Sequence, residues 1–253
     1  INIGGSTSGT VTIGSGTNTV DYPSGTTVDF TGATVSGLSS STWATLGDKD
    51  GASGPQAIII GENAVGGTEA VAIGKNAGDG GGDYSQAIGN NAGNTGQGVA
   101  AVALGSQSGE TSQGDKAVAV GQYAGQTSQG TESVAIGMLA GKLNQGAQTI
   151  AIGSEAGRDD QSANGIALGH EAGRADQADF GIAIGEKSGN SNQGIRGIAI
   201  GRSSGKTDQG TKAVAIGDAA GYATQGAGAI AIGDLAGETN QAANSIVINA
   251  SGT

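Results

Sequence analysis

From residue 86 onward, the same pattern of apolar and small residues recurs at every sixteenth position of the chain. A typical unit carries Val or Ile, then Ala, then Ile, Leu or Val, followed by a glycine that we call the anchor; the first unit begins with Gln86, and the last has Val247 in place of Ala. A second glycine stands four residues after most anchors, and a glutamine stands eight residues after. Disordered low-complexity chains do not place residue types at fixed distances, so the period predicts a folded repeat. The anchors are Gly89, Gly105, Gly121, Gly137, Gly153, Gly169, Gly185, Gly201, Gly217 and Gly233, and Asn249 takes the next position.

This unit predicts one rung of a parallel β-solenoid. Its β-branched residues lie two apart and are bounded by glycines and small polar residues, and the unit is too short for a helical hairpin. Two earlier anchors, Gly61 and Gly74, are spaced more closely than the later ones. Rungs stacked at about 4.8 Å between Gly61 and Asn249 predict a rod about 58 Å long. The glycine-rich residues 78–83 predict a loop inside the irregular part.

The first 54 residues have a different texture. Short alternating stretches occur there, and Trp43 and Leu46 form the one large apolar cluster near a chain end. We therefore predict two parts: an N-terminal β segment and cap over residues 1–54, and an all-β repeat domain over residues 55–253.

Alternation along each apolar triplet places Val and Ile on one face of the strand and Ala on the other. Ala occupies this central position in ten successive units. A position kept small and apolar packs closely against a flat neighbour, so we expect both faces to be dry, with the large aliphatics buried and the Ala face covered by other copies of the chain. A homotrimer is the simplest closed arrangement of three such rods around one axis.

Composition and charge narrow the possible functions. The chain has 52 glycines, no cysteine, and only one Trp, four Tyr and two Phe, which argues against a thick core and against a disulfide framework. Its net charge of −11, with no cluster of Lys or Arg, makes nucleic acid a poor partner. The absence of a long apolar run predicts no membrane insertion.

Candidate chemistry is sparse. His170, the only histidine, follows its anchor directly, where other units carry Ser106 or Arg202, so a variable surface residue fits better than a catalytic one. The period of sixteen also excludes the hexapeptide acyltransferase fold, because sixteen is not a multiple of six. Asp160 and Asp176 could share Ca²⁺ with the neighbouring Asp159, although solvated turn residues are the favoured interpretation. We therefore predict a protein that is not an enzyme and has no cofactor and no metal.

Two columns of polar residues, one of threonine and one of glutamine, could in principle bind a ligand. The threonines six residues after the anchor are interrupted by Leu143, Asp159 and Ala223, which argues against a flat ice-binding array. The glutamines predict an inward amide ladder, in which each side chain hydrogen-bonds to neighbouring rungs, and a ligand-facing stripe is the alternative. The column comprises Gln97, Gln113, Gln129, Gln145, Gln161, Gln177, Gln193, Gln209, Gln225 and Gln241.

Binding to a partner is predicted on the variable positions. Residues one, two and five positions after the anchor differ freely between units, as they do on the binding faces of repeat proteins. Aromatic and apolar side chains on such a surface contribute most to recognition. The receptor-binding candidates are Tyr123, Leu139, Tyr222 and Leu235.

The motif Val134-Ala135-Ile136-Gly137 and its siblings resemble the repeats of the YadA-like heads of trimeric autotransporter adhesins. The resemblance covers about residues 57–250 and implies a left-handed parallel β-roll, intertwined as a homotrimer. The sixteen-residue form with the turn Thr127-Ser128-Gln129-Gly130 is similar to repeats in fibre proteins of tailed phages and other viruses, and residues 24–35 resemble segments of phage structural proteins.

The resemblance implies a structural, adhesive fibre protein located in the virion, as a tail-fibre shaft or receptor-binding segment that mediates host attachment. Its partners would be further copies of itself and a host cell-surface receptor, either glycan or protein. The alternative is the head of a bacterial trimeric autotransporter adhesin at the cell surface. A solenoid enzyme acting on polysaccharide is a third interpretation, and it would require a carboxylate cluster on a concave face.

Overall fold

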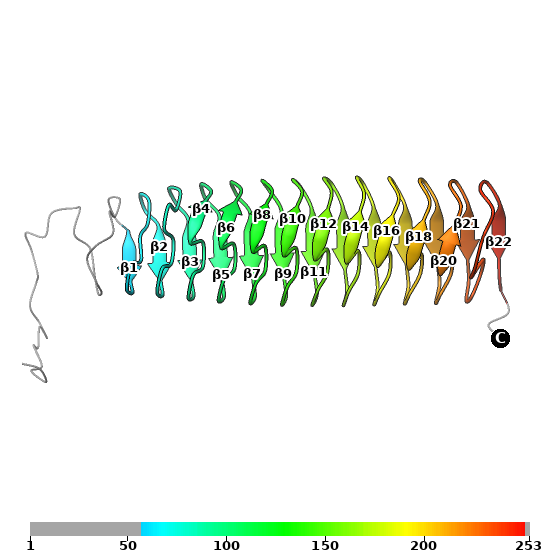
Figure 1. Cartoon of the computed structure of the whole chain (residues 1–253), viewed down its shortest axis with the longest axis horizontal. Coiled ribbons are helices and arrows are strands. Elements are labelled where there is room, and N and C mark those ends of the chain that lie inside the picture. The colour runs from blue at the N-terminus through cyan, green and yellow to red at the C-terminus, as the bar shows by residue number, and fades with distance from the viewer. Residues whose placement is uncertain (1–56, 251–253) are drawn as a thin grey trace, which may run out of the picture. The chain divides into compact units, whose positions relative to one another are not determined.

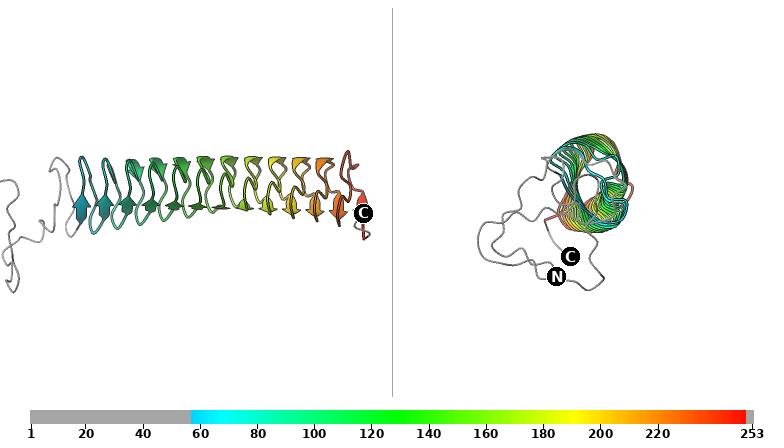
Figure 2. Two further views of the ribbon diagram at one scale, coloured as in Figure 1. Left: turned by 90° about the horizontal axis from the view of Figure 1, so that it is seen from below. Right: turned by 90° about the vertical axis from the view of Figure 1, so that its left-hand side faces the viewer.

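The computed structural model describes residues 57–250, which form a parallel β-solenoid of three-residue strands with no helix in this range (Figure 1). Seen end on, successive rungs superimpose as one closed coil (Figure 2). The predicted solenoid is therefore confirmed. The predicted N-terminal β segment over residues 1–54 lies outside the described residues.

Each regular rung up to residue 225 contributes one strand to each of two parallel sheets, and the next rung adds only an isolated bridge at Thr239 to the second. The apolar triplets form the first sheet, which has 13 strands. These are β1 (Ile58–Ile60), β2 (Val71–Ile73), β3 (Gln86–Ile88), β5 (Val102–Leu104), β7 (Val118–Val120), β9 (Val134–Ile136), β11 (Ile150–Ile152), β13 (Ile166–Leu168), β15 (Ile182–Ile184), β17 (Ile198–Ile200), β19 (Val214–Ile216), β21 (Ile230–Ile232) and β22 (Ile246–Ile248).

The triplets that end in the repeated glutamine form the second sheet, which has nine strands. It starts later along the rod, because the two short rungs contribute no strand to it. Its members are β4 (Thr95–Gln97), β6 (Thr111–Gln113), β8 (Thr127–Gln129), β10 (Leu143–Gln145), β12 (Asp159–Gln161), β14 (Ala175–Gln177), β16 (Ser191–Gln193), β18 (Thr207–Gln209) and β20 (Ala223–Gln225).

The register of the first sheet follows the sequence period. Ile150 pairs with Ile166, one period later, and the same offset recurs from β3 to β22. The first rungs keep the same alignment despite their shorter spacing, since Ile58 pairs with Val71, which in turn pairs with Gln86. Residues 78–83 form turns and contain no strand, as their glycines predict.

The small residues, and not the large ones, face the inside of the coil. Ala135 and Ala151, the central residues of β9 and β11, are fully buried within their own chain. Ile136 and Leu168 point outward and remain 37% and 42% exposed. The expected orientation, with the large aliphatics inside the coil and the Ala face against another chain, is therefore wrong. A coil with so short a circumference encloses little volume, and a glutamine from the second sheet already occupies part of it in each regular rung, so the first sheet turns small side chains inward.

The anchor position tolerates no side chain because rungs stack closely there. At Gly137 φ is 128°, and an added Cβ would lie 2.6 Å from the carbonyl oxygen of Gly153 in the next rung. Asn249 has a Cβ at this position, and no described rung stacks on it. Its Nδ2 donates a 2.7 Å hydrogen bond to the carbonyl oxygen of Asp234 in the rung before. Asn249 thereby satisfies a backbone acceptor at the end of the described stack.

Candidate functional site

The glutamine column lies inside the coil and links both sheets. Gln113 Nε2 donates to the Val102 carbonyl oxygen of its own rung at 2.8 Å and to Gln129 Oε1 of the next rung at 3.0 Å. From Gln145 to Gln241 the amide-to-amide bonds form one unbroken ladder. The ladder is interrupted only near its start, where the buried Oε1 atoms of Gln97, Gln113 and Gln145 have no partner among the described residues.

The glutamines also explain the second recurring glycine of each unit. At Gly141 φ is 52°, and an added Cβ would lie 2.6 Å from Gln145 Oε1. The amide of each glutamine thus occupies the space that a side chain at this glycine would need. The described interior is filled by Ala, Gly, buried Ser and Thr and these amides, with Ile59 in the first rung, so the candidate functional surfaces lie on the outside of the rod.

The first outer surface is the outward side of the 13-stranded sheet, which we call the aliphatic face. It carries the first and last residues of every strand in this sheet, which are aliphatic except at Gln86. These side chains are half-buried to exposed, and they form two continuous columns along the rod. A contiguous apolar surface of this extent is rare on monomeric soluble proteins and marks an interaction site.

The second outer surface follows the turn after each anchor. Tyr123 and Leu139 occupy equivalent positions in adjacent rungs, and both adopt left-handed backbone conformations with φ of 60° and 61°. Tyr222 and Leu235 lie in adjacent rungs near the other end of the solenoid. The four predicted receptor-binding residues therefore form two pairs, separated by five rungs between Leu139 and Tyr222, or about 24 Å. They do not form one site.

Tyr222 is held by a lysine from the preceding rung. Lys206 Nζ lies 4.7 Å from the centre of the Tyr222 ring and donates a 2.8 Å hydrogen bond to its hydroxyl. The aromatic ring is thus fixed in place before any partner binds.

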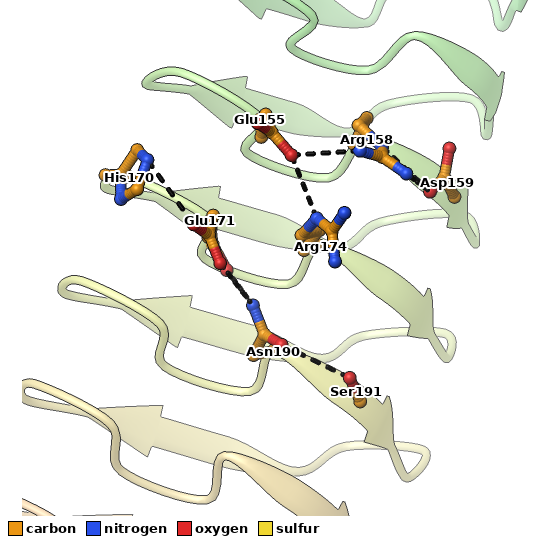
Figure 3. Close-up of polar contacts among 8 residues, drawn as sticks. All are labelled: Glu155, Arg158, Asp159, His170, Glu171, Arg174, Asn190 and Ser191. Carbon is orange, nitrogen blue, oxygen red and sulfur yellow. Dashed lines mark hydrogen bonds and ion pairs between the residues drawn. The ribbon is translucent and has the colours of Figure 1, made fainter.

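The rungs between the two pairs carry a cluster of charged side chains, whose members are shown in Figure 3. Glu155 Oε2 accepts hydrogen bonds from Arg158 Nη1 at 3.0 Å and from Arg174 Nε at 2.9 Å in the next rung. Arg158 also pairs with Asp159, with its Nη2 at 2.8 Å from Oδ2. The cluster connects two rungs, and both of these carboxylates are engaged by arginine.

These ion pairs shift the titration of their members. Burial opposes ionisation of Glu155, but hydrogen bonds and attraction from Arg174 and Arg158 outweigh it and lower the pKa of its carboxyl below 4.5. The hydrogen bond to Asp159 is the main reason that the pKa of Arg158 is raised. Farther along the solenoid, the hydrogen bond from Arg202 to Asp218 in the next rung likewise raises the pKa of Arg202.

His170 lies at the exposed edge of this cluster. Its Nε2 is 3.5 Å from Glu171 Oε1, while Asn190 Nδ2 donates a 2.9 Å hydrogen bond to the Glu171 backbone oxygen (Figure 3). His170 is exposed, and it has no nucleophile or second base among its described contacts. This environment fits the surface role predicted for it.

Of the aspartates considered for Ca²⁺, Asp160 and Asp176 are the exposed central residues of neighbouring strands in the second sheet, and Asp159 is half-buried. Asp160 Oδ1 accepts a 2.7 Å hydrogen bond from Asn144 Nδ2 in the preceding rung. Within residues 57–250, no three His, Cys, Asp or Glu side chains come together as a metal site.

Several exposed apolar residues were missed by the sequence analysis. Met138 is 50% exposed beside Leu139, and Phe180 is 49% exposed on the opposite turn, with the Arg196 guanidinium 5.5 Å from its ring centre. Phe180 stands two residues before β15, a position filled by polar residues in most rungs, and this contrast is the signal that could have identified it.

None of the described segments is a helix that could span a membrane. Comparison of the chain with protein-family models, with curated proteins and with solved structures finds no match.

Proposed function

We propose that this chain is a non-enzymatic fibre segment, the shaft or receptor-binding part of a phage or viral tail fibre, and that it acts as a homotrimer in host attachment. The aliphatic face is the observation that carries this proposal. A single rod leaves its large aliphatic side chains in water, and three rods around one axis would cover them.

The outer turns support a role in recognition. The interior columns of Ala and Gln repeat almost unchanged, whereas the residues after each anchor vary from rung to rung. A scaffold of this kind holds different side chains at a regular spacing, with little consequence for its fold. Tyr123 with Leu139, and Tyr222 with Leu235, are the proposed contacts with a host glycan or protein.

The head of a bacterial adhesin remains the second candidate, because the same trimeric rod would serve it equally well. The carboxylates of Glu155 and Asp159 are engaged by arginines, which gives a polysaccharide-cleaving enzyme little support.

Two measurements test the proposal. Light scattering on the purified chain is expected to give three times the monomer mass of 24.0 kDa, and a monomer would contradict the assembly.

A double variant, Tyr123→Ser with Tyr222→Ser, is expected to lose attachment to host cells while keeping its melting temperature. Tyr84→Ser, at an exposed tyrosine outside the two pairs, is the matched control. Unchanged attachment of the double variant would leave this segment as a spacer.

A further inference from the structure

The aliphatic face is bordered by two rims of different composition. The entry rim consists of the residues two positions before each strand of the first sheet, and the exit rim consists of the residues directly after each anchor. Because one rim precedes the outward-facing residues and the other follows them, the rims lie on opposite edges of the face. In the four rungs from β15 to β21 the entry rim contains Phe180, Arg196, Lys212 and Gly228, and the exit rim contains Glu186, Arg202, Asp218 and Asp234.

The two rims carry opposite charge in these rungs. The entry rim has two basic residues and no acid, for a charge of +2, whereas the exit rim has three acids and one base, for a charge of −2. Asp179 precedes Phe180 and so stands one position farther from the sheet than the rim.

The charges at Arg196 and Glu186 are not paired strongly within the chain. The described contact of the Arg196 guanidinium is the Phe180 ring. Glu186 lies 3.9 Å from Lys187 and is attracted weakly by Arg202 of the next rung, but no described side chain donates a hydrogen bond to it. Arg202, by contrast, is neutralised on its own chain by Asp218 at 2.7 Å.

Symmetry decides which rims would meet when copies cover the aliphatic face. If the rotation axis runs parallel to the rods, the entry rim of one copy lies against the exit rim of the next, and equivalent rungs lie at the same height. If two rods pack antiparallel, like rims meet instead. The opposite charges of the two rims therefore favour the parallel arrangement and oppose the antiparallel one.

The positions of Arg196 and Glu186 along the rod axis also allow a contact between neighbouring copies. Each rung rises by about 4.8 Å, so Arg196, which follows Glu186 by a little over half a period, lies about 3 Å above it along the axis. This offset is within reach of an arginine and a glutamate on neighbouring chains.

We propose that the aliphatic face binds further copies of this chain in parallel and in register, and that Arg196 of one copy pairs with Glu186 of the next to set that register. The inference rests on the proposed self-association and adds the direction and alignment of the rods. Phe180, beside the same rim, extends the apolar surface that the neighbouring copy covers.

Cysteine cross-linking tests the register, because the chain has no native cysteine. The double variant Arg196→Cys with Glu186→Cys is expected to form inter-chain cross-links on oxidation or with a short bismaleimide. Arg196→Cys alone is expected to form none. Cross-linking by the single variant would show that like rims meet and would overturn the proposal.

Charge exchange tests the pair itself. Arg196→Glu and Glu186→Arg are each expected to weaken association about threefold or more per interface, and the double exchange is expected to restore it. Lys142→Glu, at a lysine five residues after its anchor and outside both rims, makes the same change in charge as Arg196→Glu and serves as the control.

A monomeric native chain would overturn both the proposed assembly and this inference. An oligomer in which neither the cross-link nor the rescue occurs would overturn the register alone.

Discussion

Gln177 Nε2 donates a 2.9 Å hydrogen bond to Gln193 Oε1, one rung along the solenoid. The same nitrogen donates to the Ile166 carbonyl oxygen at 2.9 Å, so one buried amide connects the two sheets of its own rung and also the next rung. The ladder therefore supplies polar cohesion in an interior where, among the described residues, Ile59 of the first rung is the only large buried apolar side chain.

Replacing Gln177 is expected to destabilise the rod. Gln177→Leu removes an acceptor for Gln161 and a donor for Gln193, and each buried group left unpaired costs about 1–3 kcal/mol. Urea unfolding of the purified protein measures the loss. Gln97→Leu, at a glutamine outside the continuous ladder, is the control and is expected to cost less. Equal losses would show that the amide-to-amide bonds contribute little.

The inward position of Ala151 predicts failure of folding when it is charged. Ala151→Glu places an unpaired carboxylate in the closed coil and is expected to cost several kcal/mol. Ile152→Glu, at the next residue but on the aliphatic face, is expected to leave the rung folded and to reduce association. Circular dichroism and light scattering on both variants separate these effects. Normal folding of Ala151→Glu would contradict the inward orientation of the alanines.

The lowered pKa of Glu155 predicts a loss of stability in acid. Because its folded-state pKa lies below its ordinary value of 4.5, the contribution of the ionised carboxylate is complete above that pH and is lost as the pH falls through the folded-state pKa. The melting temperature of Glu155→Gln is therefore expected to lie below that of the native chain at neutral pH, and the difference is expected to shrink in acid. The contribution is at most about 1 kcal/mol, because the groups are partly exposed. Asp176→Asn controls for the change in net charge, and a difference that stays constant with pH would contradict the prediction.

Asn249 predicts where regular stacking ends. Asn249 lacks the left-handed φ that the glycine anchors before it adopt, so its backbone does not continue in the geometry that a further regular rung needs. A copy of residues 218–233 placed directly after Asn249 is therefore expected to remain unprotected in hydrogen exchange. The same extension combined with Asn249→Gly and Val247→Ala is expected to become protected. Protection in both proteins would show that the asparagine does not stop the stack.

Much of this architecture is determined by the sequence itself. The constant repeat period defines the rungs, the apolar triplets define the strands, and the anchors must be glycine because the chain has left-handed φ there and touches the next rung. Each of these features depends on local geometry repeated many times, so the repeat reveals it without knowledge of the packing. The inward glutamines also belong to this group, because an identical polar residue in a stacked column can satisfy its own neighbours.

Only the tertiary structure decided which side of the strand is inside. The alternation of Ile150, Ala151 and Ile152 is compatible with either orientation, and the usual preference for burying large apolar residues suggests the wrong one. The closed coil is so narrow that Ala and the glutamine amides fill it, which forces the large aliphatics outward. The opposite rims of Arg196 and Glu186, and the separation of Tyr123 from Tyr222 along the rod, likewise follow from how the coil closes and stacks. Whether two residues face each other, lie on opposite edges or lie far apart along the rod is set only when the rungs stack in space.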